Sequence, residues 1–132
     1  MAKSDKEHAE QLLRMAAKDR TALASMLDAQ SFSEEVFGFH AQQTVEKALK
    51  AWIAALGSVY PKSHDISVLI KILKESGQDL SMFPDLEEYS VFAVQYRYEA
   101  YDESEEVLDR PKTIGSTMGL LAHVQGIIGR MT

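Results

Sequence analysis

The most chemically suggestive stretch is residues 39–52, a helix-forming segment that carries polar side chains among large apolar ones. On a helical wheel, at about 100° per residue, Gln42 and Glu46 both fall inside the arc of the large apolar residues Phe39, Val45, Leu49, Ile53 and Leu56. A buried carboxylate lowers stability unless a cation or hydrogen-bond donors compensate it. Glu46 is therefore expected to have a partner in the fold.

Two cations are candidates for that partner. Arg97 stands in the aromatic-rich segment VQYRYEAY, and Lys50 lies one helical turn beyond Glu46, where it can form an ordinary surface pair. Gln42 and Glu46 would then form a structural polar network that fixes the helix register. Alternatively, they would line a polar pocket or a partner-binding seam. The sequence leaves both interpretations open.

The histidines do not predict a metal site. The four are His8, His40, His64 and His123, and no two of them are three or four residues apart, so no helical metal pair exists. With no cysteine there is no thiolate site either, and neither a phosphate-binding loop nor a dinucleotide fingerprint occurs. No metal and no cofactor is expected. His64 precedes Asp65 at a helix start, which favours a capping or turn role, and His40 is expected at the surface or at a dimer edge.

Length and charge limit the function classes. The 132 residues, 45% of them hydrophobic, suit a single domain over residues 1–132. The net charge of −6 makes the chain a poor general binder of RNA, and no DNA binding is expected. No apolar run approaches the roughly 20 residues of a membrane span, and the N-terminus has no secretory signal. We therefore expect a soluble, cytoplasmic protein.

The elements that must position these residues are helices. Apolar spacing, caps and stop signals predict five of them, and Pro61, Pro84 and Pro111 fall between them. The expected ranges are 6–28, 34–56 with Ser33 as N-cap, 66–75 capped by Ser63 or Asp65, 85–98, and 112–130. Short connections predict an all-α fold, a five-helix antiparallel up-and-down bundle.

The last predicted helix has two notable features. Its expected apolar stripe consists of Ile114, Met118, Leu121, Val124, Gln125 and Ile128. Four glycines lie in or near it, although glycine disfavours helix interiors by roughly 1 kcal/mol. These are Gly115, Gly119, Gly126 and Gly129, and they suggest a close approach of two helices.

Several motifs together resemble the HEPN family (higher eukaryote and prokaryote nucleotide-binding domain). Its members carry a helix of the form F-x-A-Q-Q-x-x-E-K-x-L-K-A, then a Ser/Thr-His-Asp step before a Leu-rich helix, and further on an Arg-Tyr pair. The corresponding residues here are Phe39, Ala41, Gln42, Gln43, Glu46, Lys47, Leu49, Lys50 and Ala51, then Ser63, His64 and Asp65, and finally Arg97 and Tyr98. The similarity covers about residues 9–128.

The resemblance implies a five-helix bundle that forms homodimers, and one of two roles. Many short members form a complex with a minimal nucleotidyltransferase. Others are metal-independent RNases, often toxins, in which an Arg is followed after four to six residues by a His that assists proton transfer.

This sequence departs from the RNase pattern. No His follows Arg97 in the window, and Asp102 occupies the position after a four-residue spacer. An ionised Asp102 would repel a phosphodiester. No catalytic residue is therefore assigned, and the RNase role becomes the alternative.

The resemblance favours a non-catalytic partner of a minimal nucleotidyltransferase, in a nucleotide-binding or toxin–antitoxin-type complex. A nucleotide is a candidate ligand, and a nucleotide-binding module working alone is a third hypothesis. The candidate binding residues are Arg97, His40, Gln43, Lys47 and Lys50, and the expected structural polar seam is Gln42, Glu46, His64 and Asp65.

Overall fold

The structure, a computed structural model, describes residues 4–90 and 108–131, and its elements there are all helical. They are the α-helices α1 (Asp5–Ala24), α2 (Glu34–Ala55), α3 (Ile66–Glu75) and α5 (Arg110–Gly129), and the short 3₁₀ helix η1 (Leu86–Ser90). The predicted all-α class is confirmed. The helix count differs, because these residues hold four α-helices where five were expected.

The difference lies in the fourth predicted helix, residues 85–98. Its first part is η1, in which Leu86 and Tyr89 are buried three residues apart, a spacing that suits the tighter 3₁₀ geometry. Residues 91–98 lie outside the described residues.

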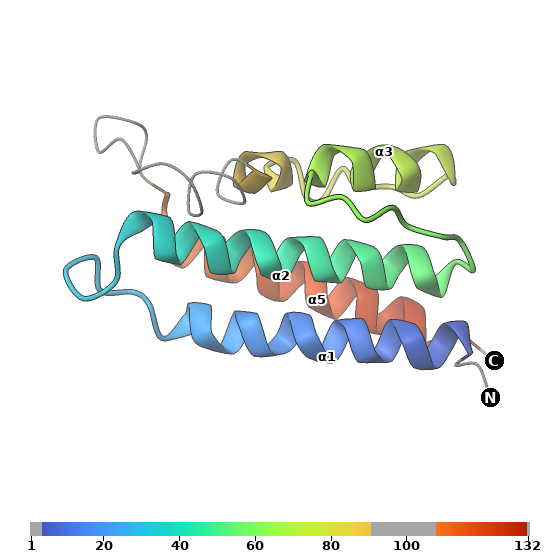
Figure 1. Cartoon of the computed structure of the whole chain (residues 1–132), viewed down its shortest axis with the longest axis horizontal. Helices are drawn as coiled ribbons and strands as arrows, with labels where there is room; N and C mark the ends of the chain where they lie inside the picture. Colours follow the sequence, from blue (N-terminus) through green and yellow to red (C-terminus); the bar gives the residue numbers. More distant parts are fainter. Residues whose placement is uncertain (1–3, 91–107, 132) are drawn as a thin grey trace.

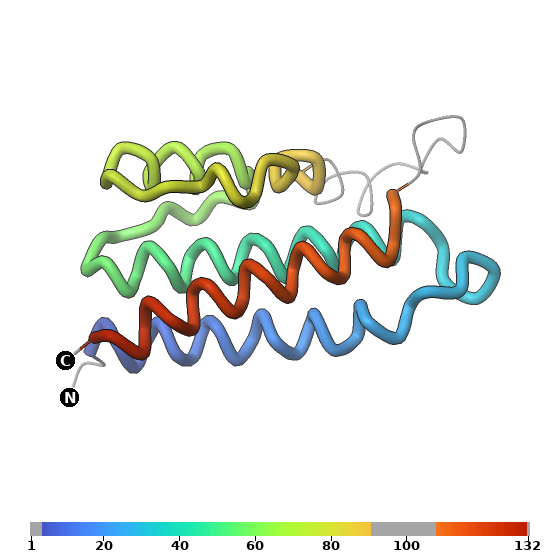
Figure 2. The backbone as a smooth tube through the Cα atoms, turned by 180° about the vertical axis from the view of Figure 1, so that it is seen from behind, coloured from blue at the N-terminus to red at the C-terminus, as the bar shows by residue number. Residues whose placement is uncertain are grey.

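Helix α2 is the centre of the molecule and contacts α1, α3, α5 and η1. Helices α1, α2 and α5 pack lengthwise against one another, and α3 and η1 lie along the other side of α2 (Figure 1). The first turn of α1 and the last turn of α5 lie at the same end of the molecule (Figure 2). Helix α2 is therefore the element against which all the other described helices pack.

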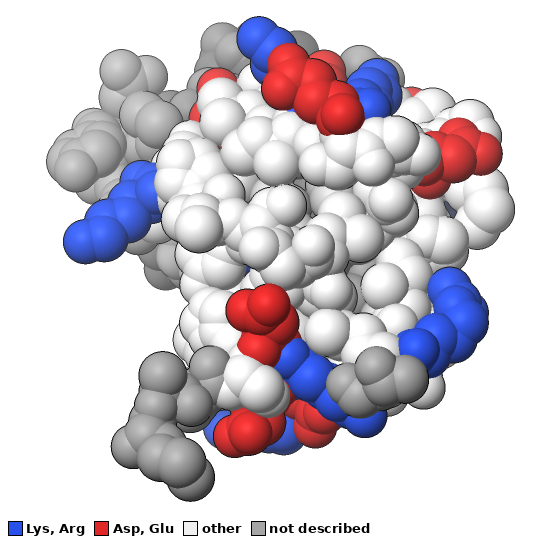
Figure 3. Space-filling view, turned by 90° about the vertical axis from the view of Figure 1, so that its right-hand side faces the viewer, with Lys and Arg blue, Asp and Glu red and all other residues white. Residues whose placement is uncertain are grey.

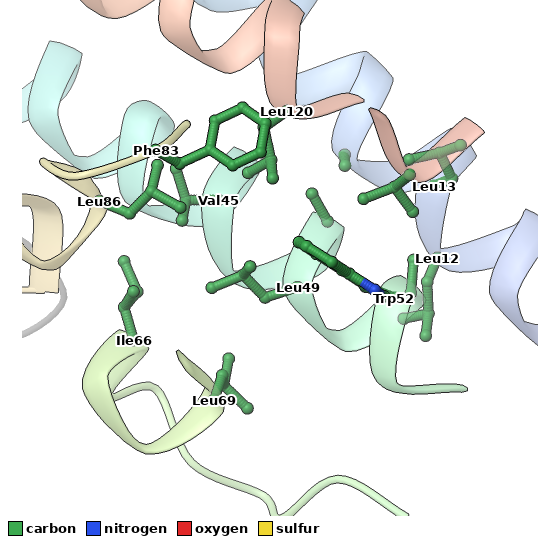
Figure 4. Close-up of a cluster of buried hydrophobic side chains, with 14 of the residues drawn as sticks. Leu12, Leu13, Val45, Leu49, Trp52, Ile66, Leu69, Phe83, Leu86 and Leu120 are labelled. Carbon is green, nitrogen blue, oxygen red and sulfur yellow. The ribbon is translucent and has the colours of Figure 1, made fainter. Parts of the chain in front are cut away.

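The apolar core surrounds most of α2, since 13 of its residues are buried. Its large buried side chains come from α1, α2, α3 and α5, and from the loop and 3₁₀ helix that follow α3 (Figure 4). The labelled members are Leu12, Leu13, Val45, Leu49, Trp52, Ile66, Leu69, Phe83, Leu86 and Leu120. Burying each such side chain contributes about 1.5–3 kcal/mol before conformational entropy is counted. This burial, rather than helix propensity, holds the helices together.

The ends of α2 and α3 follow from their capping residues. The Ser33 hydroxyl accepts the backbone N–H of Val36, and the Asp65 carboxylate accepts that of Ser67. After each helix a glycine adopts the left-handed conformation, Gly57 with φ 77° and Gly77 with φ 81°. The ranges predicted for these two helices are confirmed within one residue.

Helix α1 ends four residues before the predicted position 28. The Ser25 hydroxyl and backbone N–H both bond to the carbonyl of Ala22 and close the last turn. Asp28 instead begins a turn by accepting the backbone N–H of Gln30, and this hydrogen bond lowers the pKa of the Asp28 carboxyl. Met26 beyond the helix end is still buried, which explains why the apolar pattern looked helical there.

Helix α5 corrects three expectations. It begins at Arg110, so Pro111 lies in its first turn, where a missing N–H costs nothing, and not between helices. The expected stripe is partly wrong, since Met118 is 51% exposed and the buried positions are Arg110, Thr113, Thr117, Leu120, Val124 and Ile128. The glycines do not mark a close helix contact either: a Cβ on Gly115 or Gly129 would meet no atom within 4 Å.

The buried Arg110 fastens the α1–α2 connection to the start of α5. Its guanidinium donates to the carbonyls of Met26 and Phe32, each at 2.8 Å, and lies 3.4 Å from the Glu34 carboxylate. It also stands 4.8 Å from the centre of the Phe37 ring, a cation–π distance. One side chain therefore satisfies two loop carbonyls and orients the first turn of α2.

Replacing Arg110 by Ala should lower the free energy of unfolding by about 3 kcal/mol, because the two carbonyls and Glu34 lose their buried partner. The matched control is Lys112→Ala, two residues on, whose side chain is 71% exposed and should matter by less than about 0.5 kcal/mol. Urea unfolding of both variants measures the difference. Equal midpoints would contradict the role given to Arg110.

Candidate functional site

The polar centre of the molecule is the Glu46 carboxylate on α2, which is only 4% exposed. Gln42 Nε2 donates to Glu46 Oε1 at 2.7 Å, and His64 Nδ1 lies 2.9 Å from the same oxygen. Lys50 Nζ approaches Oε2 at 3.1 Å. Both carboxylate oxygens thus have a partner, and a cation one turn away balances the buried charge.

The Lys50 pair differs from the ordinary surface pair expected from the sequence. The Lys50 side chain is 12% exposed and that of Glu46 6%, so solvent screens their attraction little. Lys50 Nζ also lies 5.6 Å from the centre of the Tyr60 ring, in a cation–π arrangement. Lys50 is therefore occupied on two sides by groups of its own chain.

Tyr60 extends this network to α1. Its hydroxyl is 2.6 Å from His8 Nε2, and the two rings stack with an interplanar angle of 11°. Burial raises the pKa of the Tyr60 phenol, so the hydroxyl keeps its proton near neutral pH. A continuous chain of polar contacts thus runs from His8 through Tyr60, Lys50 and Glu46 to His64, and we call it the Glu46 network, with Gln42 included.

A second polar cluster joins α1 to α2 on a different side of α2. The Asp19 carboxylate lies 3.3 Å from His40 Nδ1 and forms an ion pair with Lys47. The three side chains are between 16% and 28% exposed. Asp19 and Lys47 carry opposite charges, and the two contacts of Asp19 hold the middle of α1 against α2.

The structure thus separates the candidate binding residues. His40 and Lys47 meet at Asp19, whereas Lys50 belongs to the Glu46 network. Gln43 borders that network, since its Nε2 donates to Gln42 Oε1 at 2.7 Å. Arg97, suggested both as a binding residue and as the partner of Glu46, lies outside the described residues.

Of the four residues assigned to the polar seam, the structure brings together Gln42, Glu46 and His64. Gln42 Nε2 also lies 3.4 Å from the backbone carbonyl of His64, so two contacts tie α2 to the connector before α3. Asp65 does not join them and caps α3 instead. The cap follows from the sequence, but the contact between His64 and Glu46 does not.

Sequence reasoning missed Tyr60, His8 and Asp19. Their contacts span 52, 21 and 28 positions along the chain, and no periodicity reports such distances. The one available signal was the position of Tyr60 beside Pro61, in a connector that must pass over the last turns of α2.

Within residues 4–90 and 108–131, no group of three or more His, Asp or Glu side chains could hold a metal ion. No helix in these ranges is long and apolar enough to cross a membrane.

Glu46→Gln should lower the free energy of unfolding by about 3 kcal/mol, because it leaves the nearly buried Lys50 ammonium without its counter-charge. The matched control is Glu75→Gln, which removes the carboxylate of another i,i+4 pair, with Lys71, whose side chains are 67% and 77% exposed. That variant should change stability by less than about 0.5 kcal/mol. Urea unfolding near neutral pH measures both.

A double variant separates charge imbalance from lost shape. Glu46→Gln combined with Lys50→Met removes both charges and keeps similar volumes, so it should be less destabilised than Glu46→Gln alone. If the double variant loses the sum of both single effects, the two charges do not compensate each other.

The sequence was compared with known proteins. The HEPN domain family model matches residues 9–114, which include α1 from Ala9 on, α2, α3, η1 and the first turn of α5. No curated protein and no solved structure gave a significant match. The matched range contains every residue of the Asp19 cluster and all of the Glu46 network except His8. The HEPN superfamily comprises nucleotide-binding and RNase-type domains, and the chain belongs to it as a HEPN domain protein.

Proposed function

We propose that the chain is a non-catalytic HEPN protein that acts as the partner of a minimal nucleotidyltransferase, in a nucleotide-binding or toxin–antitoxin-type complex. Membership of the HEPN family supports the general class, a nucleotide-binding or RNase-type domain. The absence of a histidine in the window after Arg97 supports the non-catalytic role, because RNase members place their proton-transfer group there.

The observation that carries the proposal is that all four histidines already contact other side chains of the fold. Nδ1 of two of them faces a carboxylate, one stacks on a tyrosine, and one packs between two aromatic rings. The pairs are His40 with Asp19, His64 with Glu46, His8 with Tyr60, and His123 with Trp52 and Phe83. Each histidine thus has a partner within the fold, which supports a structural role for it.

In this proposal the protein is a homodimeric platform whose polar surface contacts the partner or a nucleotide. Arg97, His40, Gln43, Lys47 and Lys50 remain the candidate residues. His40, Gln43 and Lys47 are half-buried along α2, so they can present an edge to a ligand while their structural partners hold them.

Co-expression with a nucleotidyltransferase encoded beside this gene should yield a stable complex on affinity purification and size exclusion. The chain alone should elute as a homodimer. Recovery of a monomer that retains no nucleotidyltransferase would contradict the proposal. An unrelated nucleotidyltransferase of similar size is the control for non-specific retention.

An RNase with an altered active site is the second candidate, and His64 favours it. The His64 side chain is 54% exposed although its Nδ1 faces the buried Glu46. A carboxylate that holds one imidazole nitrogen while the ring stays accessible is an arrangement that general bases use. Lys50 on the same carboxylate argues against it, because it already neutralises the charge that would stabilise an imidazolium.

Incubation of the purified chain with tRNA and total RNA should give no cleavage above that of Arg97→Ala and His64→Ala variants. The exposed Lys112→Ala variant controls for contaminating nuclease, since it should behave as the wild type. Cleavage that persists in Lys112→Ala but disappears in either of the other two would replace the partner role by the RNase role.

A further inference from the structure

A groove between α1 and α5 lies apart from both polar clusters. It has a volume of about 630 Å³, and its lining includes no residue of the Glu46 network or of the Asp19 cluster. Its floor is aliphatic, made by Leu13, Leu121 and Ile128. Exposed Ala17, Ala122 and Gly129 also line it, and their small side chains let another backbone approach closely. Figure 2 shows α5 lying across α1 on this side of the molecule.

Basic side chains border the groove. Its charged lining residues are Lys6, Arg14, Arg20 and Glu10, a balance of 3 − 1 = +2 in a chain of net charge −6. Within residues 4–90 and 108–131, none of the three cations forms an ion pair. The same holds for Lys18, Lys62, Lys74 and Arg130, so what distinguishes the groove is that three such cations line it together. Seen from the right-hand side of Figure 1, acidic and basic side chains stand around the edges of the molecule, and uncharged residues fill most of its centre (Figure 3).

The chemistry of the floor argues against a nucleic acid in this groove. Single-stranded nucleic acid binds through aromatic platforms on which bases stack, and through cations that follow the backbone. None of the described lining residues is aromatic, so bases would find no stacking platform among them. An aliphatic floor with small flanking residues instead suits the apolar face of an α-helix.

The charge argues against a second copy of the chain. A two-fold interface places the same patch on both subunits, so the cations of one groove would face those of the other. Such like-charge contacts disfavour association. The three cations, which form no ion pair with a described residue, instead suit carboxylates of a different molecule.

We propose that the α1–α5 groove binds an amphipathic helix of another protein. Its apolar face packs on Leu121, Ala17 and Ala122, above the buried Leu13 and Ile128, and its flanking Asp and Glu residues pair with Lys6, Arg14 and Arg20. The span from Lys6 to Arg20 is about 21 Å along α1, which matches roughly four turns of a bound helix. This inference does not depend on the partner being a nucleotidyltransferase.

The test uses the full chain and a labelled synthetic helical peptide of about 15 residues, with leucines at i, i+3, i+4 and i+7 positions and glutamates elsewhere. A second peptide replaces every glutamate by lysine, and oligo(U) RNA is the third probe. Fluorescence anisotropy should detect binding of the acidic peptide alone, weakening as salt rises. The double variant Arg14→Glu/Arg20→Glu should reduce that affinity by about tenfold or more.

Two controls make each outcome decisive. Lys18→Glu, at an exposed position of α1 outside the groove, should leave the affinity within about twofold. Ala17→Trp leaves the net charge unchanged and should weaken binding of the acidic peptide, because the indole ring would fill the groove. Failure of the acidic peptide to bind, equal binding of both peptides, RNA binding that is lost in the Arg variant, or a homodimer that dissociates in that variant would each overturn the proposal.

Discussion

The rest of the structure depends on one constraint, the burial of the Glu46 carboxylate within the most buried helix. A carboxylate that is only 4% exposed needs hydrogen-bond donors or a cation at both of its oxygens. Gln42 and Lys50 supply it from the preceding and following turns of α2, and His64 supplies it from the connector to α3. The contact with His64 sets where the chain returns over α2, and so where α3 begins. Lys50 also lies over the ring of Tyr60, and the hydroxyl of Tyr60 contacts His8 of α1, so the network reaches α1 as well.

Local rules explain how much of the fold could be predicted. Helices α2 and α3 carry clear signals at both ends, namely Ser33 and Asp65 as caps and Gly57 and Gly77 in left-handed conformations. Helix α1 lacks a stop signal of that kind, and its apolar pattern continues through the buried Met26 after the helix has ended. In α5, Thr113 and Thr117 occupy buried positions that a search for apolar residues passes over.

The candidate site was harder to predict than the fold because its contacts join distant parts of the chain. The helical wheel places Gln42 and Glu46 inside the apolar arc, and the structure buries both. It cannot say that the partner of Glu46 is His64, 18 positions away, or that His40 and Lys47 share Asp19 of another helix. Arg110 was missed because the expected helix started after it, although its packing against Phe37 and two loop carbonyls makes it as integral as an apolar core residue.

The distribution of charge across α1 links these observations to function. On the wheel of α1, His8 and Asp19 lie on one side of the apolar stripe and face α2, while Lys6, Glu10 and Ala17 lie on the other side and line the groove. On the first side, His8 contacts Tyr60 and Asp19 contacts His40 and Lys47, and these contacts hold α1 against α2 and its connector. On the second side three cations have no ion pair within the described ranges, and the surface beside them comes from Leu121 and small residues, because Leu13 and Ile128 are buried in the core. In this arrangement the Glu46 network and the Asp19 cluster hold the helices together, and the cations of the α1–α5 groove remain for recognition. This division agrees with the proposed role of a non-catalytic partner.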